Sequence, residues 1–224
     1  MPKTMRVRKT ASSRAGEWAS SADASDAGYP RSLISAAACI PPRYNDGVPF
    51  SVRDFEPEDF DALWRIDQDC FASGISYSRQ ELKFYLQRAK AFALVATHVG
   101  MLDGPNVKGG RSLPAALVSR PIAGFIVAET SGHGTGHIIT IDVVAAARRS
   151  GVGSLLLRAA EDRVRAAGCV SVTLETAVDN ISALSFYKRH GYTVFRTFPH
   201  YYSNGVDALA LKKEFEATAL SRES

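Results

Sequence analysis

The stretch Arg148-Arg149-Ser150-Gly151-Val152-Gly153 decides the fold, because it separates two segments of different periodicity. The preceding run, 137–144, is rich in β-branched residues and predicts a strand. The following run, 155–157, is Leu-Leu-Leu and opens an apolar helical segment. A strand, a basic glycine turn and a helix in this order place free backbone N–H groups at the positive end of a helix. Such a turn suits a pyrophosphate group.

The two glycines of the turn allow close approach to a ligand. Gly151 and Gly153 let the backbone reach phosphate oxygens without an intervening Cβ. The spacing R-x-x-G-x-G differs from both the Walker A pattern and the dinucleotide fingerprint. Taken by itself, the hexapeptide also fits an ordinary helix start with a glycine turn.

Two further segments follow the turn in order. Residues 172–180 read Val-Thr-Leu-Glu-Thr-Ala-Val-Asp-Asn, and residues 183–192 read Ala-Leu-Ser-Phe-Tyr-Lys-Arg-His-Gly-Tyr. With the turn, they resemble the signature of the GNAT N-acetyltransferase superfamily. The order L-E-x-x-x-x-N, F-Y-x-x-x-G-Y and a late Tyr201-Tyr202 is most similar to the ribosomal-protein-alanine N-acetyltransferases. The resemblance covers residues 50–213.

The resemblance implies an α/β protein with the GNAT fold. In that fold, helices flank a mixed, mostly antiparallel central sheet, and the cofactor lies where strands four and five splay apart. The periodicity of the sequence predicts strands at 50–53, 92–96, 122–128, 137–144, 170–174, 192–196 and 208–211. It predicts helices at 56–66, 78–88, 155–167 and 180–189.

Length and composition predict one domain. The chain has 224 residues, of which 46% are hydrophobic, enough for one sizeable core. We expect a disordered or extended basic tail at 1–47, the GNAT domain at 48–215 and a C-terminal tail at 216–224. A Gly- and Pro-containing insertion at 100–119 reads as a long hairpin loop. The chain has no apolar run of membrane-spanning length.

The positive charge is concentrated at the N-terminus. Residues 1–47 hold seven basic and four acidic residues, whereas the remainder holds 20 and 19. The basic balance therefore describes the tail, and we expect no nucleic-acid partner except through it. Its Arg- and Ser-rich start, with Glu17 as the one acid in the first 20 residues, also fits an organelle transit peptide. The expected partners are acetyl-CoA and an acceptor amine, with no membrane.

Three cysteines, Cys39, Cys70 and Cys169, make an odd set without regular spacing. Such a set argues against a disulfide framework and favours a reducing compartment, so we expect a cytoplasmic protein. Core packing is the favoured interpretation of Cys70 and Cys169. The sequence carries no metal-binding pattern, and we expect no metal.

The resemblance also implies which residues hold acetyl-CoA. These are the turn residues Arg148, Arg149, Ser150, Gly151, Val152, Gly153 and Ser154, the strand edge Ile141, Asp142 and Val143, and Asn180. The turn would bind by backbone donors, with the two arginines adding charge. The strand edge would pair with the peptide-like pantetheine arm and the thioester. Asn180 also fits an N-cap of the helix that follows it, and both roles can coexist.

Two residues match the catalytic groups of the family. Glu175 would be the general base on the incoming amine, acting through water, and Tyr187 the general acid that protonates the CoA thiolate. A surface carboxylate and a buried aromatic are the alternative interpretations. Asp142 is a second carboxylate near the same strands that could share the base role or bind the substrate ammonium. The family pattern does not require it.

The late tyrosines match residues that line the peptide groove of protein N-terminal acetyltransferases. Tyr201 and Tyr202 would bind the substrate, although strand-end packing is an equal alternative. His190 reads as a surface residue, and Phe186 as part of the core. The run 145–147, Ala-Ala-Ala, replaces the proline and aromatic residue often found before the basic turn.

These observations predict an N-acetyltransferase that moves the acetyl group of acetyl-CoA to a protein N-terminal α-amine by direct attack in a ternary complex. The subfamily resemblance suggests the alanine of a ribosomal protein as acceptor. The nearest alternative acceptor is a small amine, an amino acid or a lysine side chain. A non-catalytic CoA-binding sensor or interaction module, and a ribosome- or RNA-associated protein acting through its tail, are alternatives from other classes.

Overall fold

The computed structural model describes residues 49–70, 76–98, 121–131, 134–202 and 204–216. The expected N-terminal tail, Cys39, the insertion at 100–119 and nearly all of the expected C-terminal tail lie outside these residues. The predictions made for those segments therefore stay predictions. In the described part, no helix is long and apolar enough to cross a membrane.

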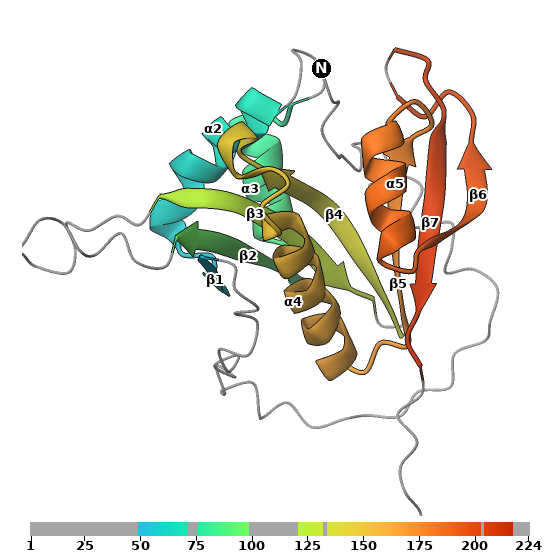
Figure 1. The fold of residues 1–224 in the computed structure, drawn as a ribbon, viewed down its shortest axis with the longest axis horizontal. Helices are drawn as coiled ribbons and strands as arrows, with labels where there is room; N and C mark the ends of the chain where they lie inside the picture. Colours follow the sequence, from blue (N-terminus) through green and yellow to red (C-terminus); the bar gives the residue numbers. More distant parts are fainter. Residues whose placement is uncertain (1–48, 71–75, 99–120, 132–133, 203, 217–224) are drawn as a thin grey trace, which may run out of the picture.

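A seven-stranded sheet forms the centre of the structure, in the order β1-β2-β3-β4-β5-β7-β6 (Figure 1). Its strands are β1 Phe50–Asp54, β2 Ala91–His98, β3 Ile122–Thr130, β4 Thr135–Val143, β5 Ser171–Ala177, β6 Thr193–Phe198 and β7 Ala208–Glu214. Neighbouring strands are antiparallel except β4 and β5, which are parallel. The expected mixed, mostly antiparallel sheet is confirmed.

The helices are α2 Phe60–Cys70, α3 Arg79–Leu86, α4 Val152–Ala166 and α5 Ile181–Arg189, with the 3-10 turns η2 Pro57–Asp59 and η4 Ala145–Ala147. The first predicted helix begins later than expected, because its opening residues form η2. There the Asp59 carboxylate accepts a hydrogen bond from the Glu56 amide (2.9 Å). The capping box predicted at Ser78 is confirmed: its side chain and that of Glu81 bond to each other's backbone amides.

Helices cover both faces of the sheet (Figure 1). On one face, α4 contributes the buried residues Leu155, Leu156, Leu157 and Val164, which pack with Ile138, Ile141, Val172 and Leu174 of the sheet. On the other face, α2 and α3 contribute Leu63, Ile66 and Leu82, which pack with Phe125, Val127 and Ile139. Cys70 and Cys169 are both free and buried, as expected.

Strands β4 and β5 run together only at their start. Their pairing extends from Thr135↔Ser171 to His137↔Thr173, although β4 continues to Val143. Beyond that point β5 pairs along its whole length with β7. Figure 1 shows the two strands close at their N-terminal ends and apart at their C-terminal ends. The expected splay between strands four and five is therefore present, and it divides the sheet into two halves.

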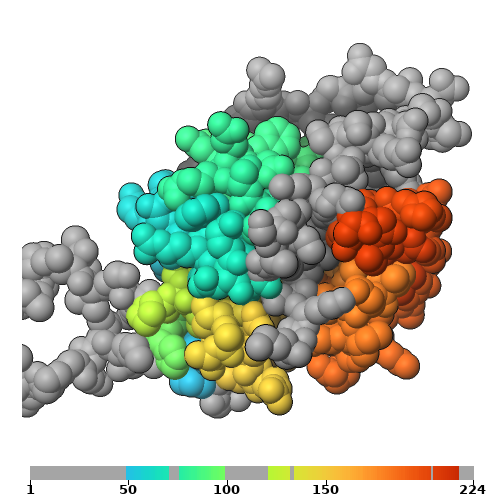
Figure 2. Space-filling model, turned by 90° about the horizontal axis from the view of Figure 1, so that it is seen from above, coloured from blue at the N-terminus to red at the C-terminus, as the bar shows by residue number. Residues whose placement is uncertain are grey.

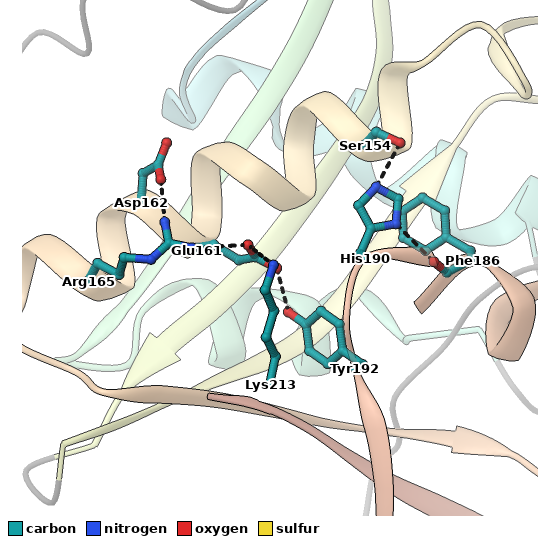
Figure 3. Close-up of polar contacts among 8 residues, drawn as sticks. All are labelled: Ser154, Glu161, Asp162, Arg165, Phe186, His190, Tyr192 and Lys213. Carbon is teal, nitrogen blue, oxygen red and sulfur yellow. Dashed lines mark hydrogen bonds and ion pairs between the residues drawn. The ribbon is translucent and has the colours of Figure 1, made fainter. Parts of the chain in front are cut away.

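A buried carboxylate joins the two halves. Glu161 of α4 is 3% exposed and accepts hydrogen bonds from the Tyr192 hydroxyl (3.0 Å) and the Lys213 ammonium (2.6 Å), as Figure 3 shows. Arg165 lies 3.5 Å from the same carboxylate. Tyr192 precedes β6 and Lys213 lies on β7, so this cluster attaches the second half of the sheet to α4. We call these four residues the Glu161 cluster.

Lys213 and its neighbour Lys212 provide a matched test of the cluster. Lys213→Met leaves the buried Glu161 carboxylate without its closest cation, which should lower the free energy of unfolding by about 2–4 kcal/mol. Lys212 pairs with the exposed Glu214 at the surface, so Lys212→Met should change it by less than about 1 kcal/mol. Urea unfolding of both variants measures the difference. Equal losses would show that the cluster does not hold the halves together.

Candidate active site

The turn before α4 has the backbone geometry of an anion site. Arg149 (φ 63°) and Gly151 (φ 90°) both adopt left-handed conformations, and Gly151 is the N-cap of α4. Turns of this kind can direct successive N–H groups toward one side. Gly151 has no side chain to cap the first-turn amides, which therefore suit an external acceptor. These features fit the phosphate role predicted for Arg149 to Ser154, which stays a prediction.

Gly153 also lies next to α5. A Cβ at this position would meet the Phe186 ring of α5 at 3.4 Å. The start of α4 therefore lies close to α5, the helix that carries Tyr187, and a small side chain at this position would make an ordinary contact. Phe186 is buried in the core, as expected.

Arg148 turns back toward the end of β4. Its Nε donates to the Val143 carbonyl (3.1 Å), and its Nη2 lies 3.6 Å from the Cys70 Sγ. The Cys70 thiol also lies 3.5 Å from that carbonyl. Burial, and then the charge of Asp142, raise the pKa of Cys70 to about 11, so the thiol stays protonated at neutral pH. The Val143 carbonyl at the predicted cofactor edge is thus already engaged by side chains of this chain.

His190 is not the surface residue that the sequence suggested. It is half-buried; its Nδ1 donates to the Phe186 carbonyl (2.8 Å), and its Nε2 lies 3.0 Å from the Ser154 hydroxyl (Figure 3). The ring also packs on Phe186 at a centroid distance of 4.3 Å. His190 therefore connects the first turn of α4 to the end of α5. The interaction joins residues 36 positions apart, which local sequence patterns do not reveal.

Asn180 is the N-cap of α5. Its Oδ1 accepts from the Ala183 amide (3.2 Å), and the residue is 5% exposed. The N-cap interpretation is confirmed, while its predicted contact with acetyl-CoA stays a prediction.

The predicted acid lies among other predicted site residues. Tyr187 of α5 is buried, and burial, then the nearby Asp142 carboxylate and Tyr202 hydroxyl, raise its pKa far above the ordinary value. Asp142 is itself fully buried and accepts a hydrogen bond from the Thr140 hydroxyl (3.0 Å). The structure therefore brings together the end of β4, the predicted acid and one predicted substrate residue. Tyr187 is therefore a neutral phenol at neutral pH, while its role as the acid stays a prediction.

The Tyr187 ring is held by the Glu161 cluster. It packs edge-on against Tyr192 at 5.4 Å between centroids, and its carbonyl accepts from the Tyr192 amide (3.0 Å). Because Tyr192 also donates to Glu161, α4 fixes the ring that supports the predicted acid.

Glu175 lies on β5 with a partner that sequence reasoning missed. Its carboxylate is 2.9 Å from Nε2 of His137 on β4, and its side chain is 16% exposed. Both are ionisable residues on strands that the fold places side by side, which is the signal that could have revealed the pair. Burial lowers the pKa of His137, but the charges of Glu175 and Glu129 outweigh burial, so its pKa is raised. The structure gives no direct contact between Glu175 and Tyr187.

The two late tyrosines differ in exposure. Tyr202 is buried, and its amide and carbonyl bond to Val206 and Gly205 within the β6–β7 connection. Tyr201 is half-buried and packs against Tyr202 (5.3 Å) and Phe198 (5.8 Å). They form an aromatic cluster next to the second half of the sheet, consistent with either packing or substrate contact.

The site therefore combines the turn predicted to bind phosphate, a stretch of β4 that pairs with β3 but no longer with β5, and the predicted acid and base. Beyond the paired start of β4 and β5, His137 contacts Glu175, and Asp142 lies near enough to Tyr187 to raise its pKa. Within the described residues, no group of three His, Cys, Asp or Glu side chains could hold a metal ion. This geometry suits acyl transfer from a phosphate-bearing thioester to an amine.

The family model described as the acetyltransferase (GNAT) family matches residues 60–192. The chain therefore belongs to the GNAT acetyltransferase family, whose members use acetyl-CoA, and it is an N-acetyltransferase. It is 29% identical to an uncharacterised N-acetyltransferase of Methanocaldococcus jannaschii, over 73% of this chain and 90% of that protein. It is 37% identical to the N-alpha-acetyltransferase MAK3 of Arabidopsis thaliana, over 41% of this chain and half of that protein.

Solved structures share the fold. Ard1 of Thermoplasma volcanium has a TM-score of 0.62 and 25% identity, with 76% of this chain and 100% of that chain covered. The ribosomal-protein-S18-alanine N-acetyltransferase of Escherichia coli gives 0.60 and 18%, with coverage of 77% and 97%. The NatC complex bound to Gag peptide and CoA gives 0.57 and 22%, with coverage of 74% and 98%. The predicted GNAT fold is confirmed.

Substitutions at Asn180 separate its capping role from cofactor binding. Asn180→Ser keeps an N-cap oxygen and should preserve stability, whereas Asn180→Ala should lose about 1 kcal/mol. If the amide also binds acetyl-CoA, both variants should raise the KM for acetyl-CoA by about tenfold. Thermal unfolding and steady-state kinetics measure the two effects. An unchanged KM in both variants would limit Asn180 to capping.

Proposed function

We propose that this protein acetylates the α-amine at the N-terminus of a peptide or protein. The observation that carries the proposal is that β4 stops pairing with β5 after His137 and runs on to Val143, which places Asp142 near the buried Tyr187 phenol. An open strand edge can pair with a pantetheine arm, and a phenol at its end can protonate a leaving thiolate. The N-alpha-acetyltransferase relatives support an N-terminal acceptor.

The chemistry is direct attack in a ternary complex. The acceptor ammonium first loses a proton through water to the base at Glu175. The neutral nitrogen then attacks the thioester carbonyl, the C–S bond breaks, and Tyr187 gives its proton to the CoA thiolate. Tyr187 recovers a proton from the positively charged nitrogen of the new amide. Acetyl-CoA supplies the acetyl group, and the turn before α4 binds its pyrophosphate.

The acceptor is tested by mass spectrometry on a mixed panel. It contains peptides with free Ala, Ser, Met or Gly N-termini, a ribosomal-protein peptide starting with alanine, N-blocked peptides with lysine, and small amines. We expect an acetyl mass gain on free peptide N-termini. A preference for the ribosomal alanine peptide would support that acceptor. Product on lysine or small amines alone would overturn the proposal, and acetyl-CoA binding without any product would favour a binding module.

Tyr187→Phe tests the assigned acid. Removing the proton donor should lower kcat by about 100-fold or more. The dissociation constant for acetyl-CoA should change little, since the ring is kept. Tyr192→Phe is the control, because it removes another buried hydroxyl from the same aromatic group. It should lower the free energy of unfolding and reduce kcat much less than Tyr187→Phe does. Full activity of Tyr187→Phe across pH would exclude Tyr187 as the acid.

A further inference from the structure

Three adjacent strands place two carboxylates and a histidine on one face of the sheet. Glu129 of β3 is directly opposite His137 in the β3–β4 register, and Glu175 lies on β5 beyond the last β4–β5 pair. A Cβ at Gly136 would meet Val164 of α4 at 2.4 Å, so Gly136 faces α4. Side chains alternate along a strand, so His137 faces away from α4. It therefore lies where β4 and β5 begin to separate.

Both ring nitrogens of His137 face carboxylates. Nε2 is 2.9 Å from Glu175, and Nδ1 is 4.0 Å from Glu129. Arg88 pairs with the far side of Glu129 at 3.1 Å. A neutral imidazole can donate to only one partner, whereas the protonated ring donates from both nitrogens. These surroundings favour the protonated ring, and the pKa of His137 is raised accordingly, although burial and Arg88 oppose the shift.

The acceptor sets a requirement for the base. A peptide α-ammonium has a pKa of about 7.7–8.0, whereas an ordinary Glu carboxyl has a pKa of about 4.3. A carboxylate with that pKa is a poor acceptor for the ammonium proton, since proton transfer would be unfavourable by more than three pKa units. A histidine with a raised pKa is much better matched. The side chains of His137 and Glu175 are 25% and 16% exposed, so water can reach the pair.

We propose that His137 and Glu175 act as one base, in which His137 holds the proton that Glu175 takes from the acceptor amine. This inference rests on the proposed function and deepens it. Glu175 receives the proton through water and passes it to Nε2 of neutral His137, whose own proton is then on Nδ1, toward Glu129. The pair then consists of an imidazolium and a carboxylate, and Glu175 regains its charge. After product release, the imidazolium returns one proton to solvent, which equals the net proton released by the reaction.

His137 is a positioning residue in this scheme, because it acts through Glu175. The active form carries neutral His137, so kcat should rise as pH increases through the pKa of the pair. A purely structural ion pair predicts something different. Its loss would lower stability and scale kcat by the same factor at every pH.

The test is the pH profile of kcat, measured on the full chain at saturating acetyl-CoA and acceptor. His137→Gln keeps a hydrogen-bond donor but cannot titrate. It should lower kcat at neutral pH by at least about tenfold and move the acidic limb of the profile to lower pH. The control is His98→Gln, at the end of β2 against Phe50, whose profile should match the wild type.

Two further variants should shift the pKa of His137 in opposite directions. Glu129→Gln removes a negative charge and should move the acidic limb by about one unit to lower pH. Arg88→Gln removes a positive charge and should move the limb to higher pH. NMR titration of the His137 ring should show the same two shifts without turnover. An acidic limb that His137→Gln leaves in place, or equal shifts in the two charge variants, would overturn the proposal.

The acceptor panel and the pH profile test the two proposals separately, so that either proposal can fail without the other. If the wild type acetylates only lysine or small amines, the proposal of a peptide N-terminus is lost. The pH profiles of kcat are then measured on the amine that reacts. They still show whether the acidic limb depends on His137. If free N-termini react but His137→Gln leaves the acidic limb in place, the proposed function is retained and the proposal of a shared base is wrong.

Discussion

The short parallel contact between β4 and β5 is the constraint on which the rest of the structure depends. Three residue pairs join the strands, and the antiparallel partners of each then draw them apart. The backbone N–H and C=O groups along an open strand edge need partners. An enzyme that pairs this edge with its cosubstrate gains a binding site from the same divergence that weakens its sheet.

A sheet divided in this way must be joined by other contacts. Here α4 provides them, with Glu161 buried between Tyr192 and Lys213 and Ser154 in contact with His190. Both contacts also lie near the proposed chemistry, since Tyr192 packs against Tyr187 and Ser154 belongs to the segment proposed to bind phosphate. Residues that stabilise the fold and residues that align the reaction are therefore partly the same.

Local signals carried most of what the sequence could predict. The Ser78 capping box, the strand–turn–helix order around Gly151 and the N-cap at Asn180 each depend on residues within a few positions. The contacts of His137 and His190 join residues 38 and 36 positions apart, so they depend on strand register and helix packing. The first helix starts at Phe60 rather than at Glu56, because the residues before it form a 3-10 turn in which Asp59 caps the Glu56 amide.

The buried phenols also set how the fold responds to alkali. Tyr187 and Tyr192 both have pKa values raised above the ordinary value, chiefly by burial, so in the native state they stay protonated where an unfolded chain would ionise. Above about pH 10, the unfolded state loses those protons and gains stability relative to the native state, by up to about 1.4 kcal/mol per pH unit for each residue. Tyr187 therefore keeps its phenol proton at alkaline pH for as long as the fold itself persists.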